Sequence, residues 1–293
     1  MTDSITFWGV RGSIASPGAS TALVGGNTTC VEVRMGGERI VLDGGTGLRE
    51  LGAAQGHEPL SAATLLFSHL HWDHIQGIPF FGPLFDPRSR VTMRGPRGLE
   101  ETLCRQMERP SFPVGMDVMG ATMDIGSLEP GDELRVGDVN VRVALLPHPG
   151  GSYGYRIEHG GRAVVFATDV ELTDAPGETL VDLARDADVL IVDAQYLPEE
   201  LPAKRGWGHS SFDVVCRLAD RARVRRLVLT HHDPTRDDGA VLAMEARARL
   251  LRPDSCAARE GMRIELSSGR MLVGSRPLGA FALADNIAGS QSP

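Results

Sequence analysis

Hydrophobic and polar residues alternate with the period of β-strands through much of the first two thirds of the chain. Residues 30–35 and 39–45 predict a hairpin around Gly36-Gly37, because paired glycines suit a tight two-residue turn. A second set of predicted strands, with turns at Gly137-Asp138 and Gly160-Gly161, covers residues 133–136, 139–148, 153–159 and 162–169. This part of the chain is therefore expected to form antiparallel sheets.

Helical periodicity is added to the strands early in the chain and dominates its last third. Predicted helices cover residues 46–54, 96–108, 179–187, 211–222 and 239–251. The strands between them cover residues 63–69, 188–195, 225–232 and 262–266. Residues 109–132 are rich in Pro, Gly and Met and give no assignment. The pattern predicts an α/β fold of two sheets flanked by helices, in one domain over residues 1–275, followed by a mobile tail over 276–293.

Composition narrows the class of protein. The chain has 293 residues, of which 42% are hydrophobic, and it carries a net charge of −8, which argues against a nucleic-acid partner. No apolar run reaches the ~20 residues of a membrane span, and the first residues lack the regions of a signal peptide. The four cysteines are scattered without a CxxC pair. We therefore expect reduced thiols in a cytoplasmic protein that is not membrane-bound.

The stretch "FSHLHWDHIQG" places four potential metal ligands directly after a predicted strand. In extended backbone His69 and His71 point to the same side, so they can hold one ion. If the chain then turns into a helix, Asp73 and His74 swing round to face a second ion. Imidazoles and carboxylates without thiolates suit Zn, Mn or Fe.

Three further potential ligands come at strand ends later in the chain. His148 ends "VALLPH", Asp169 ends "AVVFATD" and His231 ends "RLVLTH". Side chains at the ends of strands lie on one rim of a sheet, where rigid backbone can aim them. The recurrence of such residues after the histidine cluster predicts a metal centre at that rim.

The set resembles the metallo-beta-lactamase superfamily, whose five motifs occur in order: Asp43 in "VLDGGTG", the HxHxDH cluster, and then the three strand-end ligands. The resemblance implies a four-layer αββα sandwich of two mixed sheets flanked by helices. It also implies a two-metal hydrolase, with zinc most expected and an activated hydroxide between the ions. The implied ligands are His69, His71 and His148 for one metal, Asp73, His74 and His231 for the other, and Asp169 as a bridge.

Two further residues indicate a branch within the superfamily. Asp193 follows a predicted strand and His209 precedes "SSFD", and this pair is similar to one in the tRNase Z-like and cyclic-phosphate phosphodiesterase branch. A carboxylate beside an imidazole raises its basicity, and such a histidine can protonate a leaving alkoxide. The predicted catalytic residues are therefore Asp73, Asp193 and His209. Ser210 stands at a predicted helix N-terminus, where it either binds an anion or caps the helix.

The expected substrate is a small cyclic or linear phosphodiester. Only 20 residues separate His148 from Asp169, which leaves no room for the tRNA-grasping arm of tRNase Z. Arg11 lies in a glycine-flanked turn and could reach an anionic substrate, as could Asn27, although each has a structural alternative. A lactone or thioester hydrolase with the same site, and a metal-binding regulatory protein without turnover, stay open as alternatives. The resemblance also allows a homodimer.

Overall fold

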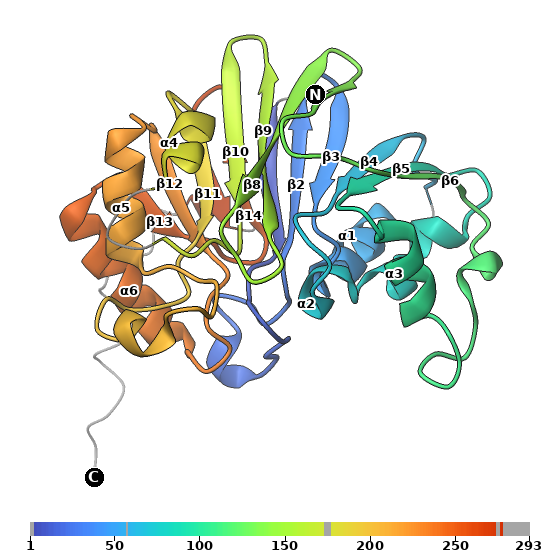
Figure 1. Cartoon of the computed structure of the whole chain (residues 1–293), viewed down its shortest axis with the longest axis horizontal. Coiled ribbons are helices and arrows are strands. Elements are labelled where there is room, and N and C mark those ends of the chain that lie inside the picture. The colour runs from blue at the N-terminus through green and yellow to red at the C-terminus, as the bar shows by residue number, and fades with distance from the viewer. Residues whose placement is uncertain (1–2, 57, 173–176, 274–275, 278–293) are drawn as a thin grey trace.

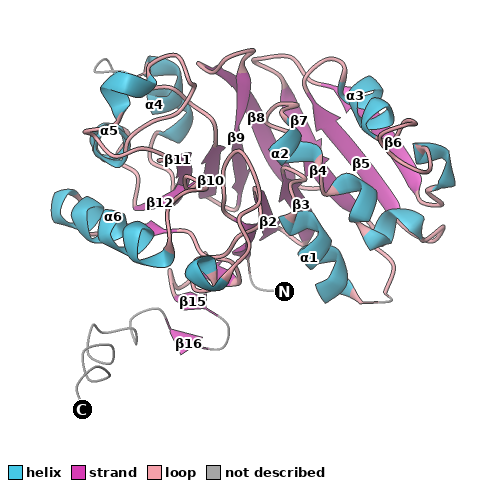
Figure 2. Cartoon of the chain, turned by 90° about the horizontal axis from the view of Figure 1, so that it is seen from below, coloured by secondary structure: helices cyan, strands magenta, loops and turns pink. Residues whose placement is uncertain are grey.

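In a computed structural model, two β-sheets pack face to face and helices cover both outer faces (Figure 1). The structure describes residues 3–56, 58–172, 177–273 and 276–277. Seen after a quarter turn, α4, α5 and α6 lie on one side of the paired sheets and α1, α2 and α3 on the other (Figure 2). The predicted four-layer αββα sandwich is confirmed.

The first sheet has nine strands in the order β16-β15-β14-β1-β2-β3-β4-β5-β6. These are β1 (Ser4–Gly9), β2 (Cys30–Met35), β3 (Glu38–Leu42), β4 (Ala63–Leu66), β5 (Arg90–Gly95), β6 (Thr122–Ser127), β14 (Met262–Glu265), β15 (Met271–Val273) and β16 (Arg276–Pro277). The strands from β3 to β6 pair in parallel and the others antiparallel, so the sheet is mixed.

The second sheet has seven strands in the order β13-β12-β11-β10-β9-β8-β7. These are β7 (Glu133–Val136), β8 (Val139–Leu146), β9 (Ser152–His159), β10 (Arg162–Ala167), β11 (Val189–Asp193), β12 (Arg226–Thr230) and β13 (Ser255–Ala257). The order of directions makes β8, β10, β11 and β12 parallel to one another, with β9 running the opposite way. Their carboxyl ends therefore meet at one edge.

Helices fill the connections. The α-helices are α1 (Gly47–Gln55), α2 (Trp72–Ile75), α3 (Leu99–Gln106), α4 (Glu178–Ala184), α5 (Phe212–Arg221) and α6 (Asp238–Leu251). Short 3₁₀ turns are η1 (Ala19–Thr21), η2 (Ile78–Phe80), η3 (Gly82–Phe85), η4 (Met116–Val118) and η5 (Leu201–Lys204). The amphipathic α5 buries Val215 and Leu218 on its inner face. The helical spacing of its apolar residues therefore turns one face of α5 toward the core.

The predicted turns at Gly36-Gly37, Gly137-Asp138 and Gly160-Gly161 each join two antiparallel strands in the structure. Gly36 and Gly37 both have positive φ, as the mirror-image turn of a two-residue hairpin requires, and so do Gly160 and Gly161. Within the predicted tail, Arg276–Pro277 pairs with β15, and residues 278–293 lie outside the described residues.

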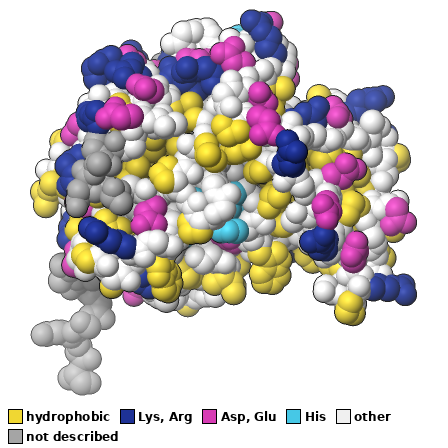
Figure 3. All heavy atoms as spheres, viewed as in Figure 1, with side chains coloured by type: hydrophobic (Ala, Val, Ile, Leu, Met, Phe, Trp, Pro, Cys, Tyr) yellow, Lys and Arg dark blue, Asp and Glu magenta, His cyan; other side chains and the backbone are white. Residues whose placement is uncertain are grey.

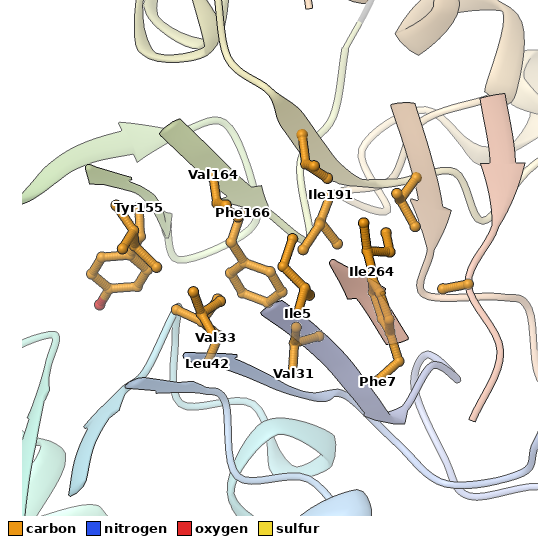
Figure 4. Packing of buried hydrophobic residues seen from close by; sticks show 14 of the residues in the cluster. Ile5, Phe7, Val31, Val33, Leu42, Tyr155, Val164, Phe166, Ile191 and Ile264 are labelled. Carbon is orange, nitrogen blue, oxygen red and sulfur yellow. The ribbon is translucent and has the colours of Figure 1, made fainter. Parts of the chain in front are cut away.

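The core between the sheets is built from β-branched and aromatic side chains that alternate along the strands. Figure 4 shows side chains of the first sheet facing those of the second, among them Ile5, Val31, Val33, Val164, Phe166 and Ile191. All six are fully buried. Burial of this kind contributes a free energy of roughly 1.5–3 kcal/mol per large side chain, so the two sheets are held firmly together.

Candidate metal centre

All seven predicted ligands meet at the edge where the strand ends converge. They come from the segment after β4, from α2, and from the segments that follow β8, β10 and β12. Four of them, the first ligand group, are His69, His71, His148 and Asp169. Three others, the second ligand group, are Asp73, His74 and His231. Within each group, one ligand atom from every residue lies within 4.8 Å of the others.

Asp169, a member of the first group, also faces the second, with one carboxylate oxygen toward the histidines of each group. Its Oδ2 is 3.7 Å from His69 Nε2 and 3.8 Å from His148 Nε2. Its Oδ1 is 3.3 Å from His74 Nε2 and 3.1 Å from His231 Nε2. A carboxylate in this position has the geometry to contact an ion in either group.

The residues fit divalent metal ions. The Nε2 atoms of His69 and His74 are buried and make no hydrogen bond, although a buried nitrogen without a partner is costly. Burial also lowers the pKa values of His69 and His148, which keeps these imidazoles neutral and their lone pairs available. A set of imidazoles and carboxylates is one that Zn, Mn and Fe accept.

The backbone is strained at two of the ligands, Asp169 and His231, and at the neighbouring Asp43. Asp43, Asp169 and His231 have φ values of 61°, 52° and 59°, in the left-handed region that residues with a Cβ seldom adopt. Asp43 directly follows β3 and His231 directly follows β12. The sharp turns end the strands and direct the side chains along the rim.

A second layer of hydrogen bonds fixes the orientation of the imidazoles. Asp43 Oδ2 lies 2.8 Å from His74 Nδ1. His148 Nδ1 lies 2.8 Å from the carbonyl oxygen of Gly208, and His231 Nδ1 lies 3.0 Å from Gln195 Oε1. In each case the Nδ1–H is directed to an oxygen, which leaves Nε2 facing the other ligands. Gln195 and Gly208 were not among the predicted site residues.

The pair of Asp193 and His209 lies against the ligand groups. His209 Nδ1 is 2.6 Å from Asp193 Oδ2, and its ring stacks on His231 at 4.9 Å between centroids. Its Nδ1 is also 4.0 Å from Asp169 Oδ2. Although burial opposes the charge, the Asp193 carboxylate raises the pKa of His209 to about 9. Asp193 is fully buried, so the pair is fixed in place.

Arg11 does not reach the ligand groups, contrary to its prediction as a substrate-binding residue. Its side chain is fully buried, and the guanidinium donates to the carbonyl oxygens of Gly25, Asp233 and Arg236. A cation enclosed by backbone carbonyls joins loops and has no free face for a substrate. The turn around Arg11 folds inward, and the sequence gives no signal for this.

Asn27 and Ser210 are also engaged in internal contacts. Asn27 Nδ2 donates to Glu260 at 3.1 Å. Ser210 is fully buried; its Oγ donates to the carbonyl oxygen of Val170 and accepts from the backbone N–H of Leu172. Ser210 therefore braces the segment after Asp169. The N-cap position of α5 belongs instead to Ser211.

Comparison with known proteins places the chain in a family. The family described as "Beta-lactamase superfamily domain" matches residues 38–232. An uncharacterised protein of Mycobacterium leprae is 31% identical over 259 residues, which cover 85% of this chain and 84% of the relative. A protein named ribonuclease Z from Mycolicibacterium gilvum is 31% identical over 234 residues, covering 71% of this chain and 78% of the relative.

The fold agrees with solved structures. A structure described as a new diphosphatase from the PhnP family superposes with a TM-score of 0.69 at 19% identity, covering 90% of this chain and 97% of the other. The chain thus belongs to the beta-lactamase superfamily, with the metallo-beta-lactamase fold and its histidine and aspartate cluster. It is a metal-dependent hydrolase of the branch that resembles tRNase Z. No described helix is both long and apolar enough to cross a membrane.

Proposed function

We propose that this hydrolase is a phosphodiesterase acting on a small cyclic or linear phosphodiester. The observation that carries the proposal is the His209–Asp193 pair, held at 2.6 Å and stacked on one of the ligand histidines. A phosphodiester with an alkoxide leaving group needs a proton on that oxygen as it departs, and a protonated imidazole at this place can supply it.

The two ligand groups are the proposed sites of two divalent ions, with Asp169 as a ligand shared by both. Zinc is the first candidate, and manganese and iron are the alternatives. Such ions would polarise a phosphoryl oxygen and lower the pKa of a bound water, so that hydroxide attacks at neutral pH. Asp73 Oδ2 faces His74 and His231 and is a proposed acceptor for a hydrogen bond from the attacking water.

His209 is the proposed general acid, and Asp193 positions it. Because Asp193 takes the Nδ1–H, Nε2 is the edge that can face a substrate; among the described residues, no hydrogen bond reaches Nε2. The raised pKa of His209 favours the protonated ring, which can give its Nε2 proton to the leaving oxygen. The backbone N–H of Gln195 donates to Asp193 Oδ1 at 2.9 Å and so holds the carboxylate in its orientation.

The names of two similar proteins support phosphorus as the reacting centre, since one is a ribonuclease and the other a diphosphatase. The described segment between His148 and Asp169 holds little more than the β9–β10 hairpin. That segment has no extended arm, and a small substrate therefore fits better than a folded RNA.

The test is hydrolysis of a nucleoside 2′,3′-cyclic phosphate, a phosphodiester whose leaving oxygen is a basic alkoxide, beside a p-nitrophenyl carboxylate ester and a lactone, with protein loaded separately with Zn and Mn. We expect phosphodiester cleavage, and we expect His209→Ala to lower kcat by roughly 10²-fold or more, the size of a general acid's contribution. Asp193→Asn should lower it less, since the imidazole stays in place. His159→Ala, at the far end of the β9–β10 hairpin, is the matched control.

The outcomes separate three readings. Cleavage of the carboxylate ester or lactone alone, with His209→Ala as active as the wild type, would overturn the phosphodiesterase proposal and keep the metal centre. Metal binding without turnover of any of the three compounds would point to the regulatory alternative. An equally large loss of kcat in His159→Ala would show that the loss in His209→Ala does not come from the site itself.

A further inference from the structure

Two of the three tryptophans are sequence neighbours of residues that contact one ligand imidazole, that of His148. Trp72 follows His71, whose Nδ1 is 3.2 Å from His148 Nε2. Trp207 precedes Gly208, whose carbonyl oxygen is 2.8 Å from His148 Nδ1. The two nitrogens face opposite sides of the ring, so the two indoles belong to segments that flank the metal centre.

Both indoles are uncovered, in contrast to their neighbours. Trp72 is 66% exposed and Trp207 is 59% exposed, whereas Asp73 and Gly208 beside them are buried. Figure 3 shows imidazole groups reaching the surface near the middle of this face, with hydrophobic side chains close around them. Large exposed aromatic side chains beside a polar centre are typical of a binding site.

An ammonium group lies on the face of Trp207. Lys204, the one lysine in the sequence, places Nζ 3.9 Å from the centroid of the Trp207 ring and 5.8 Å from that of Tyr196. The Tyr196 ring lies 5.8 Å from the His209 ring. Among the described residues no carboxylate forms an ion pair with Lys204, and its ammonium group lies one aromatic ring, that of Tyr196, away from His209.

The segment that carries Trp207 is anchored to the site. The carboxylate of Glu171 accepts the backbone N–H of Gly206 at 2.7 Å and that of Gly208 at 2.9 Å. Glu171 comes two residues after Asp169, so these hydrogen bonds link the backbone around Trp207 to the segment that carries a ligand. The backbone on both sides of Trp207 is therefore fixed, so this segment loses little backbone freedom when a ligand packs on the indole.

We propose that Trp72, Trp207 and Lys204 form a specificity subsite that binds an aromatic group of an anionic phosphodiester, as in a nucleotide. The indoles provide flat apolar surface for the aromatic ring, and the ammonium provides charge for oxygens that the metal centre does not hold. This inference rests on the proposed phosphodiesterase activity and specifies which phosphodiesters are preferred.

The test compares p-nitrophenyl thymidine 5′-phosphate with methyl p-nitrophenyl phosphate on the zinc-loaded full chain. Both release p-nitrophenol, so a difference reports the group that stays on phosphorus. We expect the wild type to prefer the thymidine ester in kcat/KM. Trp207→Ala and Trp72→Ala should each reduce that preference about fivefold or more, mainly through KM, as expected for loss of stacking on a base.

Charge and surface effects need their own variants. Lys204→Gln should also reduce the preference, because the thymidine ester then lacks a cation near its sugar and base. Leu250→Ala and Arg249→Gln are the matched controls, since both residues lie on α6 away from the metal centre and Leu250 is 86% exposed. The ratio between the two substrates should be the same in these controls as in the wild type.

A binding measurement gives a readout that does not depend on turnover. Thymidine 5′-monophosphate should quench tryptophan fluorescence while ribose 5-phosphate does not, and Trp207→Phe should remove much of the quench. Cleavage of both esters with one unchanged ratio in all variants overturns the subsite and leaves the proposed function standing. If neither ester is cleaved, the proposed function fails, and an absent quench then overturns the subsite as well.

Discussion

Asp43 orients one histidine of each ligand group through a single carboxylate. Its Oδ2 lies 2.8 Å from His74 Nδ1 and accepts from Ser68 Oγ at 2.8 Å, and its Oδ1 accepts the Ser68 backbone N–H at 2.7 Å. Ser68 Oγ in turn lies 3.0 Å from His69 Nδ1. The carboxylate therefore sets which nitrogen of both imidazoles is free to bind metal.

We expect Asp43→Ala to lower metal affinity by about 10–100-fold, the range found when such a supporting partner of a ligating histidine is removed. The measurement is competition with a chelator of known affinity, followed by metal analysis. Asp182→Ala, an exposed residue of α4, is the control. Unchanged affinity in Asp43→Ala would show that the two histidines hold their orientation without it.

The sequence could predict the ligands but not what holds them. The HxHxDH spacing and the strand-end positions depend on local geometry, and the structure brings those side chains together. Gln195 and Gly208 support ligands that lie far away in the chain, so no local pattern reveals them. Arg11 misled for the same reason, because its partners at 233 and 236 come from the other end of the sequence.

At the scale of elements, the segment after β1 holds the second ligand group in place. The Gly12 N–H donates to the carbonyl oxygen of His232 at 3.0 Å, and the Ser13 N–H donates to Asp73 Oδ2 at 2.8 Å. A Cβ at position 12 would lie only 2.3 Å from His231 Nδ1, so only glycine lets the segment approach the ring. The Arg11 guanidinium, through its hydrogen bonds to the carbonyl oxygens of Gly25, Asp233 and Arg236, holds this segment against neighbouring loops.

We expect Arg11→Met to reduce the free energy of unfolding by roughly 2–4 kcal/mol, because three buried carbonyl groups lose a charged donor. Urea unfolding monitored by circular dichroism measures the change. Arg249→Met, on the exposed side of α6, should change it by no more than about 0.5 kcal/mol. A loss below 1 kcal/mol in Arg11→Met would mean that water replaces the guanidinium without cost.

The elements themselves were largely predictable where alternation and glycine turns agree, as in the hairpins of β2–β3, β7–β8 and β9–β10. Strand ends were less so: β4 ends at Leu66, before the predicted end at His69, since the ligands leave the sheet to reach the rim. β5 and β6 received no assignment. Their sequences, "RVTMRG" and "TMDIGS", mix polar and flexible residues, and they become strands through the pairing of β5 with β4 and of β6 with β5.

At the scale of the molecule, the chemistry of the cysteines is set by burial. The four thiols are all free, as their spacing predicted. Burial raises the pKa of Cys216 to about 11 and that of Cys256 to about 12, and it raises the pKa of Cys30 as well. Cys104 is only partly buried. Since the thiolate is the reactive form, the three buried cysteines of the folded molecule are protected from thiol reagents.

We expect at most one cysteine, Cys104, to react with Ellman's reagent within minutes at pH 8 in the native protein, and four to react in guanidinium chloride. Raised pKa values keep the three buried thiols protonated at this pH. Cys104→Ser should remove the native reaction and is the matched variant. Rapid reaction of a second thiol without denaturant would show that part of the core opens under native conditions.

The place of β14 in the first sheet bears on how the chain folds during its synthesis on the ribosome. β14 pairs with β1, so that Ser4 lies opposite Glu265 across almost the whole sequence. A ribosome releases β1 first and β14 only after the last ligand, His231, has emerged. For most of its synthesis the nascent chain therefore presents an open β1 edge, and pairing of that edge with another nascent copy competes with folding until the final strands arrive.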